Sequence, residues 1–128
     1  MARFIVEGGT ALRGEITAKG NKNSALPLIA ASLLTSEPVI LRNLPRIRDV
    51  KGMLEIVGTL GATVEWLDDH SVKICTANVN QTSIDPKLSR EVRTSLLFAG
   101  PLLARFKKAT LGLSGGDVIG RRPTDTHW

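Results

Sequence analysis

The residues best suited to chemistry lie together near the end of the 128-residue sequence. Residues 114–125 read SGGDVIGRRPTD, with three glycines, two adjacent arginines and Asp117. Glycines let backbone N–H groups approach a ligand closely, and arginines present charged forks that match carboxylate and phosphate groups. Asp117 is the only acid between the glycines, so it is the candidate for proton transfer. The pattern predicts a loop that binds a small anion beside a proton donor.

A second candidate anion site lies near the start of the chain, in residues 19–24 (KGNKNS). A helix is predicted to begin there, capped by Asn23 and with Pro27 in its first turn. Its apolar face is predicted to consist of Leu26, Ile29, Ala30 and Leu33. Free N–H groups, the positive end of the helix dipole and the Lys22 ammonium would converge at its start. A capped helix with a solvated lysine explains the same pattern, and the local residues alone favour that plainer interpretation.

The elements predicted to carry these loops alternate between strands and helices. Apolar or alternating runs bounded by turn residues predict strands over residues 4–7, 12–17, 39–44, 63–67, 71–76 and 110–113. The first two strands are expected to close a small hairpin. This order predicts an α/β fold of the α+β type, with mixed sheet pairing and right-handed crossovers.

Two further helices are predicted in the middle and late parts of the chain. One begins at Asp49, which caps it or stabilises it by charge, and ends at Gly61. Its apolar stripe is Val50, Met53, Leu54 and Val57. The other begins at Ser89 and is kinked or interrupted at residues 100–101. Its predicted face is Val92, Leu96, Ala99 and Leu103. Arg93 lies in the first turn of this helix and is either a surface arginine or an anion contact close to the Lys22 loop.

The composition is that of a globular chain, with 42% hydrophobic and 23% charged residues. No apolar run reaches the length of a membrane span, and no secretory signal is visible. The single cysteine, Cys75, excludes an internal disulfide and suits a reducing cytosol. Residues 68–70 (DDH) are expected to form a solvated turn, because a metal site needs more ligands. We therefore expect a cytoplasmic protein without a metal or cofactor.

The net charge of +5 is compatible with two classes of partner. Lysine and arginine can bind the phosphates of nucleic acid. However, the chain has no tyrosine and only 4% aromatic residues, so it offers little for base stacking. Small anionic substrates are the favoured partners, and nucleic acid is the weaker alternative.

Five stretches of the sequence carry a family resemblance. They are residues 4–9 (FIVEGG), 20–27 (GNKNSALP), 41–50 (LRNLPRIRDV), 100–105 (GPLLAR) and 115–123 (GGDVIGRRP). In this order and spacing they resemble the UDP-N-acetylglucosamine enolpyruvyl transferases (1-carboxyvinyltransferases). The sister enzyme of aromatic amino-acid synthesis shares the fold but has a different loop at residues 20–23.

The resemblance implies an activity and an architecture. The family transfers the enolpyruvyl group of phosphoenolpyruvate to the 3-hydroxyl of UDP-N-acetylglucosamine and releases phosphate, the first committed step of peptidoglycan synthesis. Its fold is an inside-out barrel of βαβαββ units, of which this chain would hold one unit and the start of another. Family chains are several times longer, so we expect an N-terminal portion that is catalytically incomplete alone. Residues 1–20 would pack into the family's other domain, and residues 21–128 would form part of the N-terminal domain.

Matched positions in the family imply roles for individual residues. Asp117 corresponds to the proton donor, and Lys22 and Asn23 correspond to phosphoenolpyruvate contacts. Arg93 corresponds to a nucleotide-sugar contact. The nucleotide-sugar loop corresponds to Arg122, Pro123, Thr124, Asp125 and Thr126, with Arg122 also near phosphoenolpyruvate.

Two positions depart from the common family pattern. Most members have cysteine where this chain has Asp117, and a minority have aspartate. A carboxyl group can protonate the methylene carbon of an enol ether if burial raises its pKa, whereas Arg121 and Arg122 would lower that pKa. The expected consequences are an activity optimum shifted towards acid and resistance to fosfomycin, an epoxide that alkylates the cysteine. Leu97 replaces an aromatic residue of some members, which changes packing near the sugar.

Two other function classes stay open on the sequence. A chain that keeps only the nucleotide-sugar half-site would bind the sugar without turnover. A nucleic-acid-binding domain would show a steep salt dependence of DNA binding. In either case, sheet edges exposed in a partial domain would favour self-association.

Overall fold

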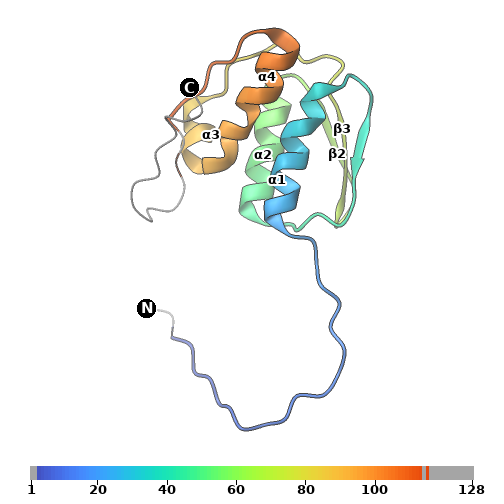
Figure 1. The fold of residues 1–128 in the computed structure, drawn as a ribbon, viewed down its shortest axis with the longest axis vertical. Helices are drawn as coiled ribbons and strands as arrows, with labels where there is room; N and C mark the ends of the chain where they lie inside the picture. Colours follow the sequence, from blue (N-terminus) through green and yellow to red (C-terminus); the bar gives the residue numbers. More distant parts are fainter. Residues whose placement is uncertain (1–2, 114, 116–128) are drawn as a thin grey trace.

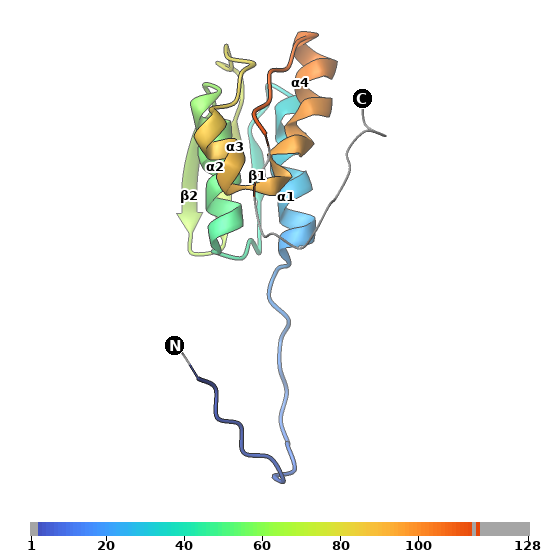
Figure 2. The same cartoon turned by 90° about the vertical axis from the view of Figure 1, so that its left-hand side faces the viewer.

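The architecture is a layer of helices on one side of a three-stranded sheet, with a long tail below (Figures 1 and 2). It is a computed structural model that describes residues 3–113 and residue 115. The elements, in chain order, are α1 (Lys22–Ala31), the 3-10 helix η1 (Ser32–Leu34), β1 (Val39–Leu41), α2 (Arg48–Thr59), β2 (Thr63–Asp68), β3 (Ser71–Cys75), α3 (Pro86–Glu91), the 3-10 helix η2 (Arg93–Phe98) and α4 (Ala99–Phe106). This arrangement confirms the predicted α/β fold.

The sheet has the order β1-β3-β2. β3 is antiparallel to both neighbours, with Ile74 opposite Val39 on one side and Val64 on the other. β1 and β2 are therefore parallel to each other, and α2 connects them. The predicted mixed pairing is wrong for this sheet, because both of its ladders are antiparallel. In the described residues, parallel pairing occurs at the isolated bridge between Ser83 and Thr110.

Helix α1 begins earlier than predicted. Its N-cap is Asn21, whose side chain accepts the Asn23 backbone N–H at 2.8 Å, so the prediction of Asn23 as the cap is wrong. Pro27 consequently lies inside the helix and not in its first turn. Pro27 has no backbone N–H, so α1 lacks one helical hydrogen bond at this position. The helix persists because its apolar face packs against the core. That face was predicted correctly and is fully covered: Leu26, Ile29, Ala30 and Leu33.

Helix α2 follows its predicted pattern closely. The stripe of Val50, Met53, Leu54 and Val57 is buried against α1 and the sheet. Asp49 lies in the first turn, where its charge suits the helix dipole, while the N-cap residue Ile47 makes no side-chain cap. Gly61 follows the helix with φ of +106°, which confirms the predicted stop.

The helix predicted from Ser89 onward is three shorter elements. Val92 is extended (φ −127°, ψ 107°) and separates α3 from η2. Asp85 caps α3 through the Lys87 N–H at 2.6 Å, so Ser89 is not the cap and is instead buried within α3. The break rotates the buried face onto Val92, Ser95, Phe98 and Leu102, whereas Leu103 is half exposed. The predicted interruption at residues 100–101 is wrong, because both residues lie within α4 and the extended residue is Val92. Pro101 is tolerated there because it lies in the first turn of α4, where its missing N–H removes no helical hydrogen bond.

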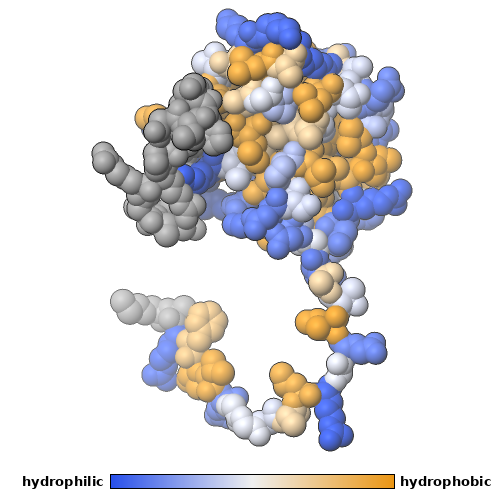
Figure 3. Space-filling model, in the orientation of Figure 1, coloured by the Kyte–Doolittle hydropathy of each residue, from blue (hydrophilic) through white to orange (hydrophobic). Residues whose placement is uncertain are grey.

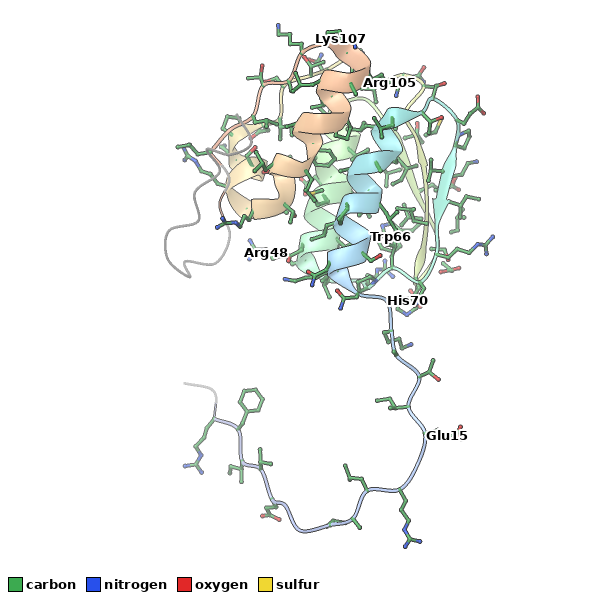
Figure 4. All side chains as sticks on the ribbon, in the orientation of Figure 1. Glu15, Arg48, Trp66, His70, Arg105 and Lys107 are labelled. Atoms are coloured by element: carbon green, nitrogen blue, oxygen red, sulfur yellow. The ribbon has the colours of Figure 1, made fainter. Side chains whose placement is uncertain are left out.

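Arg105 ties the upper ends of the elements together, away from the tail (Figure 4). Its Nη1 donates to the carbonyls of Leu33 and Thr35, at 3.0 and 3.2 Å, and to Thr76 Oγ1 at 2.7 Å. Its Nη2 donates to the Thr76 carbonyl at 3.2 Å. One planar guanidinium thus provides hydrogen-bond donors for backbone carbonyls at the ends of η1 and β3.

Three predicted strands are absent from the described residues. Residues 4–7, 12–17 and 110–113 have no ladder, and β1 is shorter than the predicted 39–44. The first two lie in the tail, residues 3–19, whose apolar side chains are exposed (Figure 3). A strand needs a partner for its backbone groups, and the tail has none within the described part of the chain.

Candidate functional site

The loop before α1 is fixed to the body of the protein by its backbone. The Gly20 N–H donates to Asn43 Oδ1 at 3.1 Å. A Cβ on Gly20 would lie 1.6 Å from the Asn43 carbonyl oxygen, so only glycine fits. Asn43 itself has φ of +56°, a conformation that asparagine tolerates better than most residues. The contact of Gly20 with Asn43 and the Asn21 cap together fix the position of the Lys22 backbone.

The Lys22 side chain reaches from α1 to α2. Its Nζ lies 2.9 Å from Asp49 Oδ2, and the two side chains are 51% and 40% exposed. Lys22 is the first residue of α1, and Asp49 lies in the first turn of α2. The ion pair therefore joins the N-terminal ends of two helices that pack side by side at the lower edge of the body (Figure 1).

Arg93 is the first residue of η2, an element that packs on α1 and α2. A Cβ on Gly52 would lie 2.4 Å from Val92 Cγ2, so the residue before Arg93 packs directly on α2. Arg48 of α2 forms an ion pair of 3.7 Å with Glu91 of α3. Figure 4 shows Arg48 at the lower end of the helical layer, where α1 begins. These contacts hold α3 and the start of η2 against α2, and Arg93 at the start of η2 is half-buried.

The start of the glycine-rich loop is also held near this end. The Gly115 N–H donates to the Ser89 carbonyl at 3.0 Å. A Cβ on Gly115 would lie 1.5 Å from the Arg90 carbonyl oxygen, which again permits only glycine. The predicted residues of this loop lie outside the described residues: Asp117, Arg121, Arg122, Pro123, Thr124, Asp125 and Thr126.

This end of the protein is suited to anions. Lys22, Arg48 and Arg93 supply positive charge, and the first turns of α1 and α2 supply backbone N–H groups and positive helix-dipole ends. Asp49 and Glu91 neutralise part of that charge through the ion pairs above. No group of three or more metal-ligating side chains gathers anywhere in the described residues. The same part of the chain holds no helix of the length and apolarity needed to span a membrane.

Sequence reasoning missed the residues that orient the predicted ones. Asn21 is as good a cap as Asn23, and only the docking of Gly20 decides between them. The partnership of Lys22 with Asp49 spans 27 positions, so no local pattern reveals it. The sequence signal that could have pointed to Asp49 is its place at a predicted helix start, directly after Arg48.

The acidic turn between β2 and β3 is the solvated turn that we predicted. Asp68 accepts the His70 backbone N–H at 2.7 Å, and this hydrogen bond is the main reason that its pKa is lowered; the Ser71 hydroxyl adds to the effect. Asp69 pairs with Arg46 at 2.7 Å, and the Arg46 guanidinium lies 4.9 Å from the centroid of the Trp66 ring. These contacts stabilise the turn at the edge of the sheet, and each acid of the turn already has a partner.

Comparison with known proteins gives consistent relatives. The sequence pattern of the EPSP synthase (3-phosphoshikimate 1-carboxyvinyltransferase) family matches residues 6–128. A UDP-N-acetylglucosamine 1-carboxyvinyltransferase of Bradyrhizobium diazoefficiens is 50% identical over 125 residues, which are 98% of this chain and 29% of that protein. The Treponema denticola protein of the same name is 48% identical over 128 residues, which are 100% of this chain and 30% of that protein. The chain thus spans about 30% of the length of these curated relatives.

A solved structure agrees with the sequence comparison. The enolpyruvyl transferase NikO from Streptomyces tendae superposes with a TM-score of 0.66 at 25% identity. The superposition covers 77% of this chain and 23% of that one. The family match over nearly the whole chain and the shared fold lead to one conclusion: the chain belongs to the EPSP synthase family.

Proposed function

We propose that this chain is part of a UDP-N-acetylglucosamine 1-carboxyvinyltransferase. Such an enzyme transfers the enolpyruvyl group of phosphoenolpyruvate to the sugar 3-hydroxyl, releases phosphate and serves peptidoglycan synthesis in the cytoplasm. The observation that carries the proposal is the 48–50% identity to proteins of that name across 98–100% of the chain. The geometry supports it, because Lys22 lies at the start of α1 beside the first turn of α2, and η2, which begins with Arg93, packs on both helices.

The proposed roles follow the predicted ones. Lys22 and Asn23 bind phosphoenolpyruvate, with Lys22 supplying an ammonium at the start of α1. Arg93 binds the nucleotide sugar, as do Arg122, Pro123, Thr124, Asp125 and Thr126; Arg122 also contacts phosphoenolpyruvate. The anchoring of Gly115 at α3 supports this grouping, since α3 directly precedes the segment that begins with Arg93.

Asp117 is the proposed proton donor. It delivers a proton to the methylene carbon of the enolpyruvyl group while positive charge develops on the adjacent carbon. A carboxylate is a far weaker nucleophile than a cysteine thiolate, so fosfomycin should leave this protein unmodified. Mass spectrometry after fosfomycin treatment tests this point: Asp117→Cys should gain the mass of the drug at position 117, while an adduct mapped to Asp117 in the unaltered chain, as distinct from its free Cys75, would refute the proposal.

Two exposed apolar regions support the view that further chain completes the domain. The tail, residues 3–19, presents Phe4, Val6 and Ile16 to solvent. The outer side of α1 and α4 presents Leu28 and Leu103, where Figure 3 shows apolar side chains gathered. We propose that residues 1–20 pack into a second domain and that residues 21–128 belong to the N-terminal one. In isolation, these surfaces would promote self-association.

A chimera tests the function directly. The matched N-terminal part of the Bradyrhizobium relative is replaced by this chain, and phosphate release from phosphoenolpyruvate is measured with and without UDP-N-acetylglucosamine. Release that depends on the sugar is expected, with a loss of at least a hundredfold in Lys22→Ala. Lys51→Ala, an exposed lysine on α2, is the matched control and should keep full activity. A folded but inactive chimera would contradict the proposed function.

A non-catalytic binding module is the second candidate. It rests on the same site, because Arg93 and residues 122–126 would suffice to hold a nucleotide sugar. Calorimetry of the 128-residue chain with UDP-N-acetylglucosamine tests this candidate, and a steep salt dependence of DNA binding would instead favour nucleic acid as the partner.

A further inference from the structure

The Lys22–Asp49 pair differs from an ordinary surface ion pair in what surrounds it. Gly20 and Asn21 already fix the backbone at the start of α1 through the contacts with Asn43 and with the Asn23 N–H. The remaining freedom lies in the long Lys22 side chain, which has a flexible four-carbon stem and loses much rotamer entropy when it is ordered. Asp49 contacts the far end of this side chain, with its Oδ2 at 2.9 Å from Lys22 Nζ.

Asp49 is placed for this task by helix α2. The residue lies in the first turn of α2, where a carboxylate interacts favourably with the positive end of the helix dipole. Here the hydrogen bond described for its carboxylate comes from Lys22 Nζ. The carboxylate therefore joins the start of α2 to the start of α1.

We propose that Asp49 is a positioning residue for Lys22, holding the ammonium where the phosphate or carboxylate of phosphoenolpyruvate must meet it. The inference rests on the proposed function of the Lys22 loop. An ammonium has three N–H groups, so one can remain on Asp49 while another donates to an anion. Orienting the lysine in advance lowers the ordering cost at the moment of binding.

The sign of one mutational effect separates this role from simple electrostatics. Asp49 carries a negative charge beside an anion site, and Coulomb's law alone says that its removal should strengthen anion binding. If Asp49 instead acts by orienting Lys22, its removal should weaken binding in spite of the lost repulsion. Asp49→Asn preserves the size of the side chain and removes its charge, so it tests the two effects against each other.

The first measurement is phosphoenolpyruvate binding to the 128-residue chain by calorimetry. We expect Asp49→Asn to bind about fivefold more weakly, which is a change of about 1 kcal/mol. Asp69→Asn is the control, because it removes the acid of another exposed ion pair, with Arg46 at 2.7 Å, at the sheet edge. Asp49→Glu keeps the charge and should recover most of the affinity.

A double mutant locates the effect on Lys22. In a Lys22→Ala background, Asp49→Asn should change the affinity no further, since there is no side chain left to orient. Unchanged or tighter binding in Asp49→Asn would overturn the proposal. An equal loss with and without Lys22 would overturn it too, because Asp49 would then act elsewhere.

A spectroscopic readout keeps the test independent of the proposed function. Proton–nitrogen NMR of lysine ammonium groups at low temperature should show a Lys22 signal that is lost in Asp49→Asn and kept in Asp69→Asn. If the unaltered chain fails to bind phosphoenolpyruvate, the proposed binding role of the Lys22 loop fails in this chain. The positioning role is then decided by this signal: a Lys22 resonance that is unchanged in Asp49→Asn overturns it.

Discussion

The body of the protein and its N-terminal tail treat the same kind of residue in opposite ways. In the body, Phe98 is completely buried, whereas Phe4 in the tail is 93% exposed. The tail has the stronger strand pattern by sequence, with Phe4, Ile5 and Val6 in one run. It nevertheless forms no strand, while β1 does so with three residues.

The difference shows what an apolar pattern can and cannot specify. A strand is completed by the hydrogen bonds of its neighbour, and β1 has β3 beside it. The tail leaves the body below α1 and meets no described strand (Figure 1). The apolar pattern of the tail therefore favours a strand only where a neighbouring strand is present, and no such neighbour lies among the described residues.

The largest test of this contrast is the removal of one aromatic ring from each region. Phe98→Ala should lower the free energy of unfolding by about 3–5 kcal/mol, because it opens a cavity in the core. Phe4→Ala should change it by less than about 0.5 kcal/mol, since the ring is already in water. Urea unfolding followed by circular dichroism measures both. Comparable losses in the two variants would show that the tail packs on the body in solution.

Replacement of Arg105 should give the next largest effect, because its hydrogen bonds join α4 to the ends of η1 and β3. Arg105→Ala should cost about 2 kcal/mol, because the Leu33 carbonyl and Thr76 lose hydrogen bonds from a charged donor, although the Thr35 carbonyl keeps the Thr76 hydroxyl. Arg105→Lys should recover less than half of that loss, since an ammonium cannot reproduce the planar fork. Full recovery by lysine in the same urea titration would contradict the geometric account.

Gly20 lies at the boundary between the tail and the body, so its replacement tests where the packed part of the chain begins. Gly20→Ala should cost about 1–3 kcal/mol, because the added Cβ would overlap the Asn43 carbonyl and force the loop to shift. Gly8→Ala in the tail is the matched control, with nothing within 4 Å of the added atom. Thermal unfolding of both variants tests this boundary, and an equal, small effect in the two would mean that the loop is not docked.

The sequence predicted the regular parts of the fold because their signals are local. The stripe of α2 and the pair of strands around Asp68 were correct, since periodicity and turn residues decide them. The helix from Ser89 was wrong because tertiary packing of Val92 on Gly52 breaks it. In the candidate site, residue types pointed to Lys22 and Arg93, whereas the ion pairs Lys22–Asp49 and Arg48–Glu91 depend on helix packing that no local pattern encodes.

The smallest expected effect concerns the turn between β2 and β3, which belongs wholly to the body. The pKa of Asp68 is below its ordinary value of 3.8, chiefly because the carboxylate accepts the His70 N–H. A carboxyl whose pKa is lowered by folding stabilises the folded state above the unfolded pKa and loses that contribution as the pH falls through the folded pKa. Stability should therefore fall with acidification below about pH 4, and Asp68→Asn should reduce that slope, because an amide does not titrate.

The measurement for Asp68 is the urea midpoint at a series of pH values from about 2 to about 6, with Asp69→Asn as the neighbouring control. In the Asp68→Asn variant, the amide oxygen of the new side chain can still accept the His70 N–H, so the turn itself is expected to persist. An unchanged slope in Asp68→Asn would mean that this hydrogen bond also forms in the unfolded chain. The turn would then be local structure of the kind that the sequence specifies unaided, in contrast to the strand pattern of the tail, which needs a partner.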